Sequence, residues 1–114
     1  MHELSIALSI VEMATEEAAR LGVRVNAIHL KLGALSGVVK DALLFSYDLA
    51  TEGTALTGSR LIIEEVPAVV YCPACDANRV IDSVQNFRCS VCNAPASQIV
   101  GGKELEVAAL EIRE

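Results

Sequence analysis

Four cysteines give the strongest chemical signal in this sequence of 114 residues. They form two C-x-x-C pairs, Cys72-Pro-Ala-Cys75 and Cys89-Ser-Val-Cys92, with thirteen residues between the pairs. Each pair places two thiolates across one tight turn, and two such turns provide the four ligands of a tetrahedral Zn²⁺ site. Because the protein fills all four positions, we expect a structural zinc site that drives the folding of its own segment.

The residue after each second cysteine suits such a turn, which usually needs a left-handed backbone there. Asp76 and Asn93 occupy these positions, and both types tolerate that conformation better than most non-glycine residues. Iron stays an alternative, because a cage of four cysteines offers it the same ligands and geometry. Paired disulfides are disfavoured in a reducing cytosol. A thioredoxin-type redox centre needs one C-x-x-C near a βαβ unit rather than two matched pairs.

The first three residues, Met1, His2 and Glu3, offer a second kind of metal site. A bulky second residue normally prevents removal of the initiator methionine, so we expect a free Met1 amine that is partly neutral at physiological pH. This amine, the His2 amide and the His2 imidazole can close adjoining chelate rings, and the Glu3 amide can complete a square. Planar nitrogen sets suit Ni²⁺ or Cu²⁺ better than Zn²⁺ or Mg²⁺. The alternative is an ordinary solvated first turn in which Glu3 favours the helix dipole.

The sequence carries no motif typical of an enzyme. Ser36 does not lie in a G-x-S-x-G elbow, and the glycine-rich stretches do not match a phosphate-binding loop. Glu64 and Glu65 adjoin in a predicted strand, so their side chains point to opposite faces. His29 lies within another predicted strand, where we expect a packed or surface-exposed side chain, with metal binding as the alternative.

Composition and charge exclude several classes of protein. Apolar residues make up 53% and charged residues 21% of the chain, which excludes intrinsic disorder. The net charge is −6, and residues 68–100 carry two basic and two acidic groups, so the basic stripe of a nucleic-acid binder is missing. No apolar run reaches the ~18 residues of a membrane helix, and we see no basic leader followed by an apolar block. We therefore expect a cytoplasmic protein that binds neither nucleic acid nor membrane.

The remaining pattern predicts the elements that position these residues. Apolar spacing indicates amphipathic helices over residues 3–21 and 38–52 and strands over 23–32, 60–66 and 103–113. The apolar stripe of the first helix is expected to be Leu4, Ala7, Leu8, Val11, Ala14, Ala18 and Leu21. That of the second is expected to be Val38, Ala42, Phe45 and Leu49.

Three local features mark the ends and irregularities of these elements. Gly22 is placed to end the first helix in a left-handed conformation, and Ser36 is a candidate N-cap for the second. In the last strand Leu105 and Val107 share one parity while Leu110 and Ile112 share the other. A β-bulge near residues 108–109 would bring all four to one apolar face.

Together these elements predict an α+β (mixed α/β) fold. Two helices should lie on a three-stranded mixed sheet whose first two strands are parallel through a right-handed crossover. The cysteine segment interrupts the sheet before its last strand as an inserted zinc-ribbon minidomain with four cysteine ligands. We expect an α/β domain from residues 1–67 plus 101–114 and a zinc-binding domain from residues 68–100.

The chain resembles the HypA/HybF family of nickel metallochaperones that mature [NiFe]-hydrogenases. The resemblance lies in MHELSIALSIVE, LGALSGV, ATEGTALTGSRLIIEEVP, the two C-x-x-C knuckles and GGKELEVAALEI, in the same order and spacing from Met1 to the last strand. Two departures are mild: neither knuckle ends in Cys-Gly, and no proline follows Cys89. They bear on knuckle geometry and leave the ligands intact.

The resemblance implies more than the residues do alone. It implies that Met1, His2 and Glu3 bind Ni²⁺ as transferable cargo and that the four cysteines hold structural zinc. It implies a partner GTPase of the HypB type and delivery of nickel to the immature hydrogenase large subunit; some members also supply urease. The alternative is a zinc-ribbon adaptor that binds a protein partner, has no nickel site of its own, and tolerates residues added before Met1.

Overall fold

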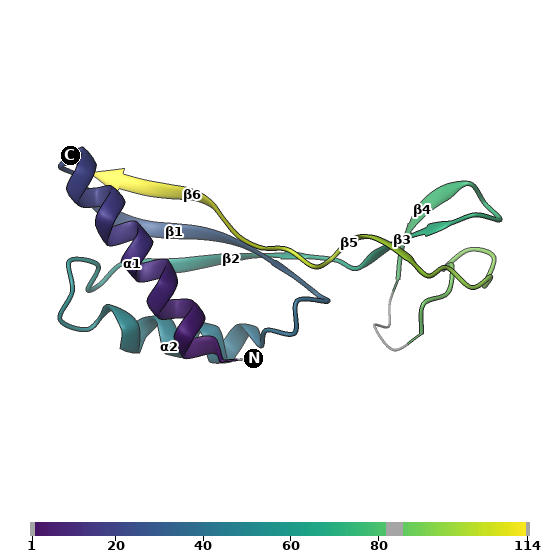
Figure 1. Ribbon diagram of the computed structural model, residues 1–114, viewed down its shortest axis with the longest axis horizontal. Helices are drawn as coiled ribbons and strands as arrows, with labels where there is room; N and C mark the ends of the chain where they lie inside the picture. The colour runs from purple at the N-terminus through teal and green to yellow at the C-terminus, as the bar shows by residue number, and fades with distance from the viewer. Residues whose placement is uncertain (1, 82–85, 114) are drawn as a thin grey trace. The chain divides into compact units, whose positions relative to one another are not determined.

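The computed structural model describes residues 2–81 and 86–113, which form two compact units. The first unit comprises the chain up to Lys31, Gly37–Glu64 and the residues from Glu106 onward, and the second comprises Leu32–Ser36 and Glu65–Leu105. The predicted α+β class is confirmed (Figure 1). The elements are α1 (Glu3–Leu21), β1 (Arg24–Gly33), α2 (Lys40–Thr51), β2 (Arg60–Val66), β3 (Val69–Cys72), β4 (Ala77–Val80), β5 (Gln98–Gly101) and β6 (Leu105–Arg113).

β1 is the central strand of a three-stranded sheet with the order β2-β1-β6. At the end of β1 the Gly33 amide donates to the Glu104 carbonyl (2.7 Å), and the Ala34 amide donates to the Val66 carbonyl (2.9 Å). The end of β1 therefore lies beside the end of β2 and beside the start of β6. β1 and β2 are parallel and β6 is antiparallel to them, as the strand directions in Figure 1 also show. The predicted mixed sheet is confirmed.

The two helices pack against each other and contribute to one apolar core with the sheet. Gly22 ends α1 in a left-handed conformation (φ 67°), as predicted. Ser36 does not cap α2: the helix begins only at Lys40, and its N-cap is Val39. Neither described helix is long and apolar enough to span a membrane.

The predicted apolar faces of the helices are partly wrong. In α1, the predicted members Leu4, Leu8 and Leu21 are about half exposed, and the buried positions are Ala7, Ile10, Val11, Ala14 and Ala18. In α2 the error is larger, because the predicted members Phe45 and Leu49 are 67% and 46% exposed while Leu43 and Tyr47 are buried. Apolar side chains surround most of α2, so periodicity alone does not select the face that meets the core.

In β6 the alternation of core-facing and outward-facing side chains shifts by one residue, as the sequence indicated. Val107 and Leu110 both pack against the core, although a separation of three would place them on opposite faces of a regular strand. Leu105 and Ile112 do not join them, since their exposed fractions are 37% and 48%. The expectation of a single apolar face with four members is therefore wrong for these two residues.

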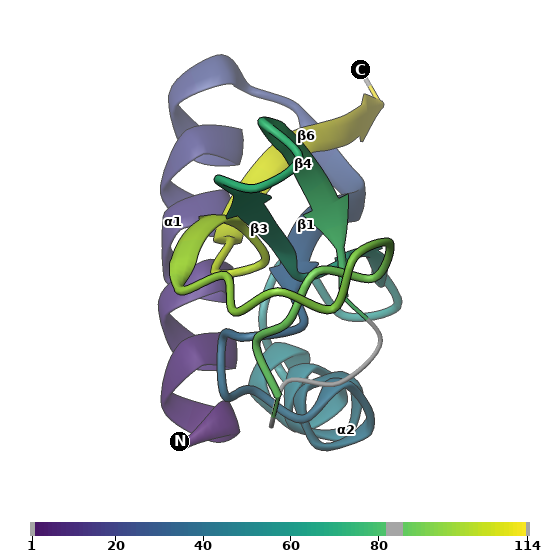
Figure 2. The ribbon, with the colours of Figure 1, turned by 90° about the vertical axis from the view of Figure 1, so that its right-hand side faces the viewer.

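The second unit contains a small sheet that the sequence pattern did not predict. Its strand order is β4-β3-β5 and both pairs are antiparallel; β3 and β4 are labelled side by side in Figure 2. Val70 on the central strand β3 is fully buried. Two backbone segments of this unit, at Gly33 and Gly102, lie in direct contact. A Cβ on Gly33 would lie 2.1 Å from the Gly102 carbonyl oxygen, so a residue with a side chain does not fit at position 33 without a shift. The small core includes Ala68, Val70, Ile81 and Ala96, with Leu35, Phe87 and Ile99 packed against it.

Candidate metal sites

The first cysteine knuckle is the turn between β3 and β4. Cys72 is the last residue of β3 and pairs with Ala77, the first residue of β4, so the chain reverses over the residues between them. Asp76 has φ 51°, and Asn93 in the second knuckle has φ 62°. These are the left-handed positions that the sequence predicted, and within the described chain no other non-glycine residue has positive φ.

The second knuckle is a tight loop closed by backbone hydrogen bonds. The Cys89 amide donates to the Ala94 carbonyl (2.9 Å), and the Asn93 amide donates back to the Cys89 carbonyl (3.0 Å). A β-bridge between Arg88 and Pro95 flanks the loop. The absence of a Cys-Gly ending therefore does not disturb the turn.

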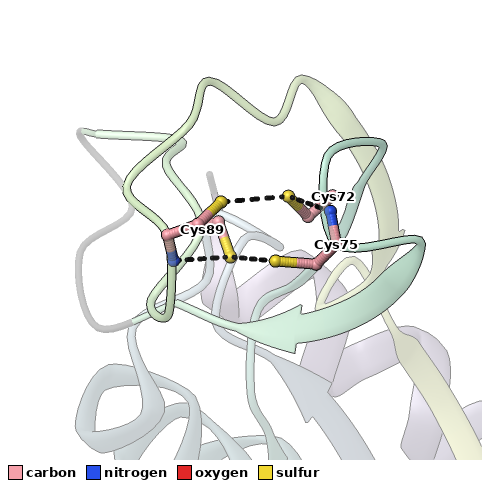
Figure 3. A group of neighbouring side chains, drawn as sticks. Cys72, Cys75 and Cys89 are labelled. Carbon is pink, nitrogen blue, oxygen red and sulfur yellow. Dashed lines mark hydrogen bonds between the residues drawn. The ribbon is translucent and has the colours of Figure 1, made fainter.

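The four sulfur atoms converge on one point (Figure 3). The Sγ atoms of Cys72 and Cys92 are 3.6 Å apart, those of Cys75 and Cys89 are 3.9 Å apart, and all four lie within 4.8 Å of one another. A tetrahedron with metal–sulfur bonds of ~2.3 Å has S···S edges of ~3.8 Å, whereas a disulfide needs ~2.05 Å. The cluster is thus positioned to bind a metal, and its geometry suits zinc and iron alike.

Backbone amides direct hydrogen bonds at these sulfurs. The Cys75 amide donates to the Cys72 Sγ, and the Cys92 and Val91 amides donate to the Cys89 Sγ, each at 3.4 Å. The Cys92 amide, followed by that of Val91, lowers the pKa of Cys89 to about 6. For Cys92, the Ala94 amide favours the thiolate, but the neighbouring Cys75 and Cys72 thiols outweigh it and raise its pKa to about 12. Backbone hydrogen bonds thus favour the thiolate at Cys89, whereas the neighbouring thiols favour the protonated form of Cys92.

Arg79 is a cation beside this cluster that the sequence analysis did not single out. Hydrogen bonding with Cys75, and then with Cys89, raises the pKa of the Arg79 guanidinium. Its Nε atom is buried and has no hydrogen-bond partner among the described atoms. Four thiolates on a divalent ion would leave two negative charges, and the Arg79 guanidinium would compensate part of that charge.

The nickel residues predicted at the N-terminus are described only in part. Met1 lies outside the described residues. His2 is exposed, is the N-cap of α1 with extended backbone (φ −83°, ψ 94°), and does not cap the helix with its side chain. Its carbonyl accepts a hydrogen bond from the Ile6 amide (3.3 Å). The His2 imidazole is thus at the surface. The backbone that carries it is held in the helix from the His2 carbonyl onward.

Glu3 begins α1, and its carboxylate makes a contact with the residue before α2. One of its oxygens accepts a hydrogen bond from the Val39 amide at 3.1 Å. That amide, and then the amide of Glu3 itself, lower the pKa of the Glu3 carboxyl. The separation of 36 residues explains why no local sequence signal predicted this pairing.

His29 is a half-buried surface residue on β1, as expected. Its Nε2 lies 3.2 Å from Glu111, and the other oxygen of Glu111 lies 3.9 Å from Arg60. Among the described residues, the four cysteines are the only group of three or more potential ligands that converge closely enough to hold an ion. His29 is therefore part of a network of polar side chains on the surface of the first sheet.

Comparisons with known proteins agree with one another. The profile of a family described as HypA, hydrogenase/urease nickel incorporation metallochaperone, matches residues 1–112. The chain is 56% identical to the hydrogenase maturation factor HypA of Chloroflexus aurantiacus over 112 residues, covering 97% of this chain and 98% of the relative. It is also 56% identical to that of a Roseiflexus species over 115 aligned positions, covering 100% and 94%.

Solved structures show the same fold at much lower identity. The solution structure of the Ni metallochaperone HypA from Helicobacter pylori aligns with a TM-score of 0.65 at 19% identity, covering 98% of this chain and 97% of the other. A second solution structure of a HypA protein aligns with a TM-score of 0.72 at 19% identity, covering 99% and 97%.

Proposed function

The chain belongs to the HypA family of hydrogenase/urease nickel-incorporation metallochaperones, and from this premise we propose how it handles its metals. Met1, His2 and Glu3 bind Ni²⁺ as cargo, and Cys72, Cys75, Cys89 and Cys92 hold structural zinc. The protein works in the cytoplasm, has no catalytic role of its own, and passes nickel to the large subunit of a [NiFe]-hydrogenase. A GTPase of the HypB type is its partner, and urease maturation proteins are alternative recipients.

The full-length family match to a nickel-incorporation profile is the observation that carries this proposal. The N-terminal motif supports it on chemical grounds, because an amine, an amide nitrogen and an imidazole in sequence form the planar nitrogen set that Ni²⁺ prefers. The exposed His2 side chain is consistent with a cargo that must later leave. Protons also compete with the metal for the terminal amine, which favours exchange.

Zinc in the four-cysteine cluster follows from the closed ligand set. The observed S···S distances of 3.6 and 3.9 Å suit a tetrahedral ion. Four protein ligands leave no position for substrate, and the apolar cluster of the same unit is small, with four buried residues and three partly buried ones packed against them. A resident ion would supply the cohesion that this core lacks.

The adaptor function is supported by one observation, the exposed apolar side chains of the helices. Phe45 is 67% exposed, and Leu8 is 51% exposed. Side chains of this kind mark many protein-binding surfaces. A metallochaperone that docks on partners needs such a surface too, so the nickel site is the feature that separates the two functions.

The test compares the two histidines of the chain. Zinc-loaded His2→Ala and His29→Ala proteins are dialysed against Ni²⁺, and both metals are then measured. We expect His2→Ala to lose nickel binding by roughly 100-fold or more, as removal of one of four ligands should. His29→Ala should bind nickel like the unaltered protein, and both should keep about one zinc per chain. Full nickel affinity in His2→Ala would refute the proposed site.

A further inference from the structure

The hydrogen bond from the Val39 amide to the Glu3 carboxylate joins the predicted nickel motif to the start of a second helix. Glu3 is the first residue of α1, and Val39 is the residue immediately before α2. The N···O distance of 3.1 Å is normal for an amide donor. Both residues lie in the first unit, so this contact belongs to one compact body.

The start of α2 lacks a capping side chain of its own. Val39 has an extended backbone (φ −86°, ψ 118°) and no side chain that can accept a hydrogen bond, and Ser36 lies too early to be the N-cap. The Val39 carbonyl accepts a bond from the Leu43 amide (2.9 Å), whereas the Val39 amide, like those of the next three residues, has no carbonyl acceptor within the helix. In a capping box, a glutamate of the same helix accepts from the N-cap amide. Here Glu3 supplies that acceptor from another helix.

We propose that the Glu3 carboxylate is a positioning group for nickel rather than a ligand: by holding the start of α1 on the start of α2, it fixes the backbone of residues 2–3 and the His2 imidazole in a binding geometry. This inference rests on the proposed nickel site. At Glu3 the backbone amide nitrogen would bind nickel, and the side-chain carboxylate would hold the start of α1 against the start of α2.

The helix geometry allows the Glu3 amide to bind metal while the Glu3 carboxylate keeps its contact with Val39. The first amides of a helix have no carbonyl acceptor within it, and the first intrahelical bond of this region runs from the Ile6 amide to the His2 carbonyl. The amides of His2 and Glu3 both precede that bond, so metal binding to them breaks no backbone hydrogen bond of α1. At Glu3 the metal replaces the interaction of the amide with its own carboxylate. The His2 carbonyl and the Glu3 carboxylate, on either side of the Glu3 amide, are both anchored. A chelate that closes through this amide thus starts from a backbone with little freedom to lose.

Two pairs of variants separate positioning from ligation. Glu3→Ala removes the acceptor, whereas Glu3→Gln keeps a side-chain oxygen that can accept from the Val39 amide but is a poor nickel ligand. Val39→Pro removes the donor at a φ close to the proline range, whereas Val39→Ala keeps it. Nickel affinity is measured on untagged, zinc-loaded protein by chelator competition, and the d–d absorption band reports the ligand set. Thermal melting confirms that each variant is folded.

We expect Glu3→Ala and Val39→Pro to weaken nickel binding roughly 10-fold, with the absorption band unchanged at saturation. Glu3→Gln and Val39→Ala should stay within about 3-fold of the unaltered protein. In the nickel-free state the Val39 amide should exchange with solvent faster in Glu3→Ala than in Glu3→Gln.

Three results would overturn the inference, and they differ from failure of the proposed function. If Glu3→Gln is as weak as Glu3→Ala, or if its absorption band shifts, the carboxylate is a ligand. If Glu3→Ala and Val39→Pro both bind nickel fully while the unaltered protein depends on His2, the contact has no positioning role. A protein that binds no nickel at all, or that binds it independently of His2, contradicts the proposed nickel site itself.

Discussion

The cysteine cluster and the N-terminal segment differ in how completely the protein surrounds a metal. The cluster draws four sulfurs from two knuckles of one unit, buries two of the cysteines, and directs backbone amides at Cys72 and Cys89. The N-terminal segment offers consecutive residues of one stretch of chain, with an exposed His2 and a hydrogen bond that ties Glu3 to Val39.

This difference teaches what each region can do with an ion. A ligand shell closed by residues distant in sequence can open only if the surrounding loops move, so exchange is slow and the ion contributes to folding. Ligands that follow one another at a chain end can be replaced one at a time by those of a recipient. Retention of one metal and exchange of another should therefore be separated between the two regions.

The largest effect is expected from loss of a buried sulfur. Cys89→Ser should abolish tight metal binding in the second unit and unfold its small sheet, because the described core of four buried residues is too small to persist alone. Ser90→Ala is the matched control, since Ser90 is exposed in the same knuckle. Metal content and amide exchange over β3 to β5 report the result. A Cys89→Ser protein that keeps one tightly held zinc would contradict the closed-shell interpretation.

The next effect concerns the contact between the two backbone segments in the second unit. Gly33→Ala should lower the free energy of unfolding by about 3 kcal/mol, because its Cβ would lie 2.1 Å from the Gly102 carbonyl oxygen. Gly101→Ala, whose Cβ would meet its nearest atom at 3.6 Å, should be close to neutral. Denaturant unfolding of the zinc-loaded proteins measures both. Equal stability of the two variants would mean that the metal alone, rather than backbone packing, holds the unit.

The third effect is a pH dependence of metal retention. Cys89, with its pKa lowered to about 6, is already a thiolate at neutral pH, whereas Cys92, at about 12, must lose a proton to bind. As pH falls through about 6, zinc must also displace a proton from Cys89. Apparent zinc affinity should then fall by an additional factor of about ten per pH unit. Proton release on zinc binding, measured at pH 5 and pH 7.5, should differ by about one proton; equal release would refute the assignment.

The smallest effect is expected at Arg79. Arg79→Gln keeps a hydrogen-bond donor near Cys75 and Cys89 but removes the positive charge, so zinc transfer to a chelator should become a few-fold faster. Arg88→Gln is the control, because Arg88 donates to the Asn93 carbonyl rather than to a sulfur. If both variants release zinc at the same rate, the charge of Arg79 does not contribute to retention.

Local sequence patterns predicted the helices, the longer strands and the cysteine knuckles well, because each of these features is determined by residues close together in the chain. Gly22 ends α1, and Asp76 and Asn93 take the left-handed positions, since each depends on the backbone of one turn. The bounds of β2 match the predicted strand over residues 60–66 for a similar reason: a run of β-branched and apolar residues ends at a proline.

Features that depend on distant partners were not predictable in this way. The buried face of α2 is set by what packs against it, so Phe45 was assigned to the core although it lies at the surface. The acceptor for the Val39 amide comes from Glu3, 36 residues away. In the sequence Arg79 is only one charge in a neutral segment, because its role depends on the thiols that folding brings beside it.

The most direct test of the separation between retention and exchange is a nickel titration of untagged, zinc-loaded protein beside the same protein with its Met1 amine acetylated. Acetylation removes the basic Met1 amine and leaves His2, Glu3 and the four cysteines in place. We expect a yellow, square-planar d–d band in the unaltered protein only, with about one zinc per chain retained in both. The same band in both proteins would contradict the N-terminal cargo site and place nickel on other ligands.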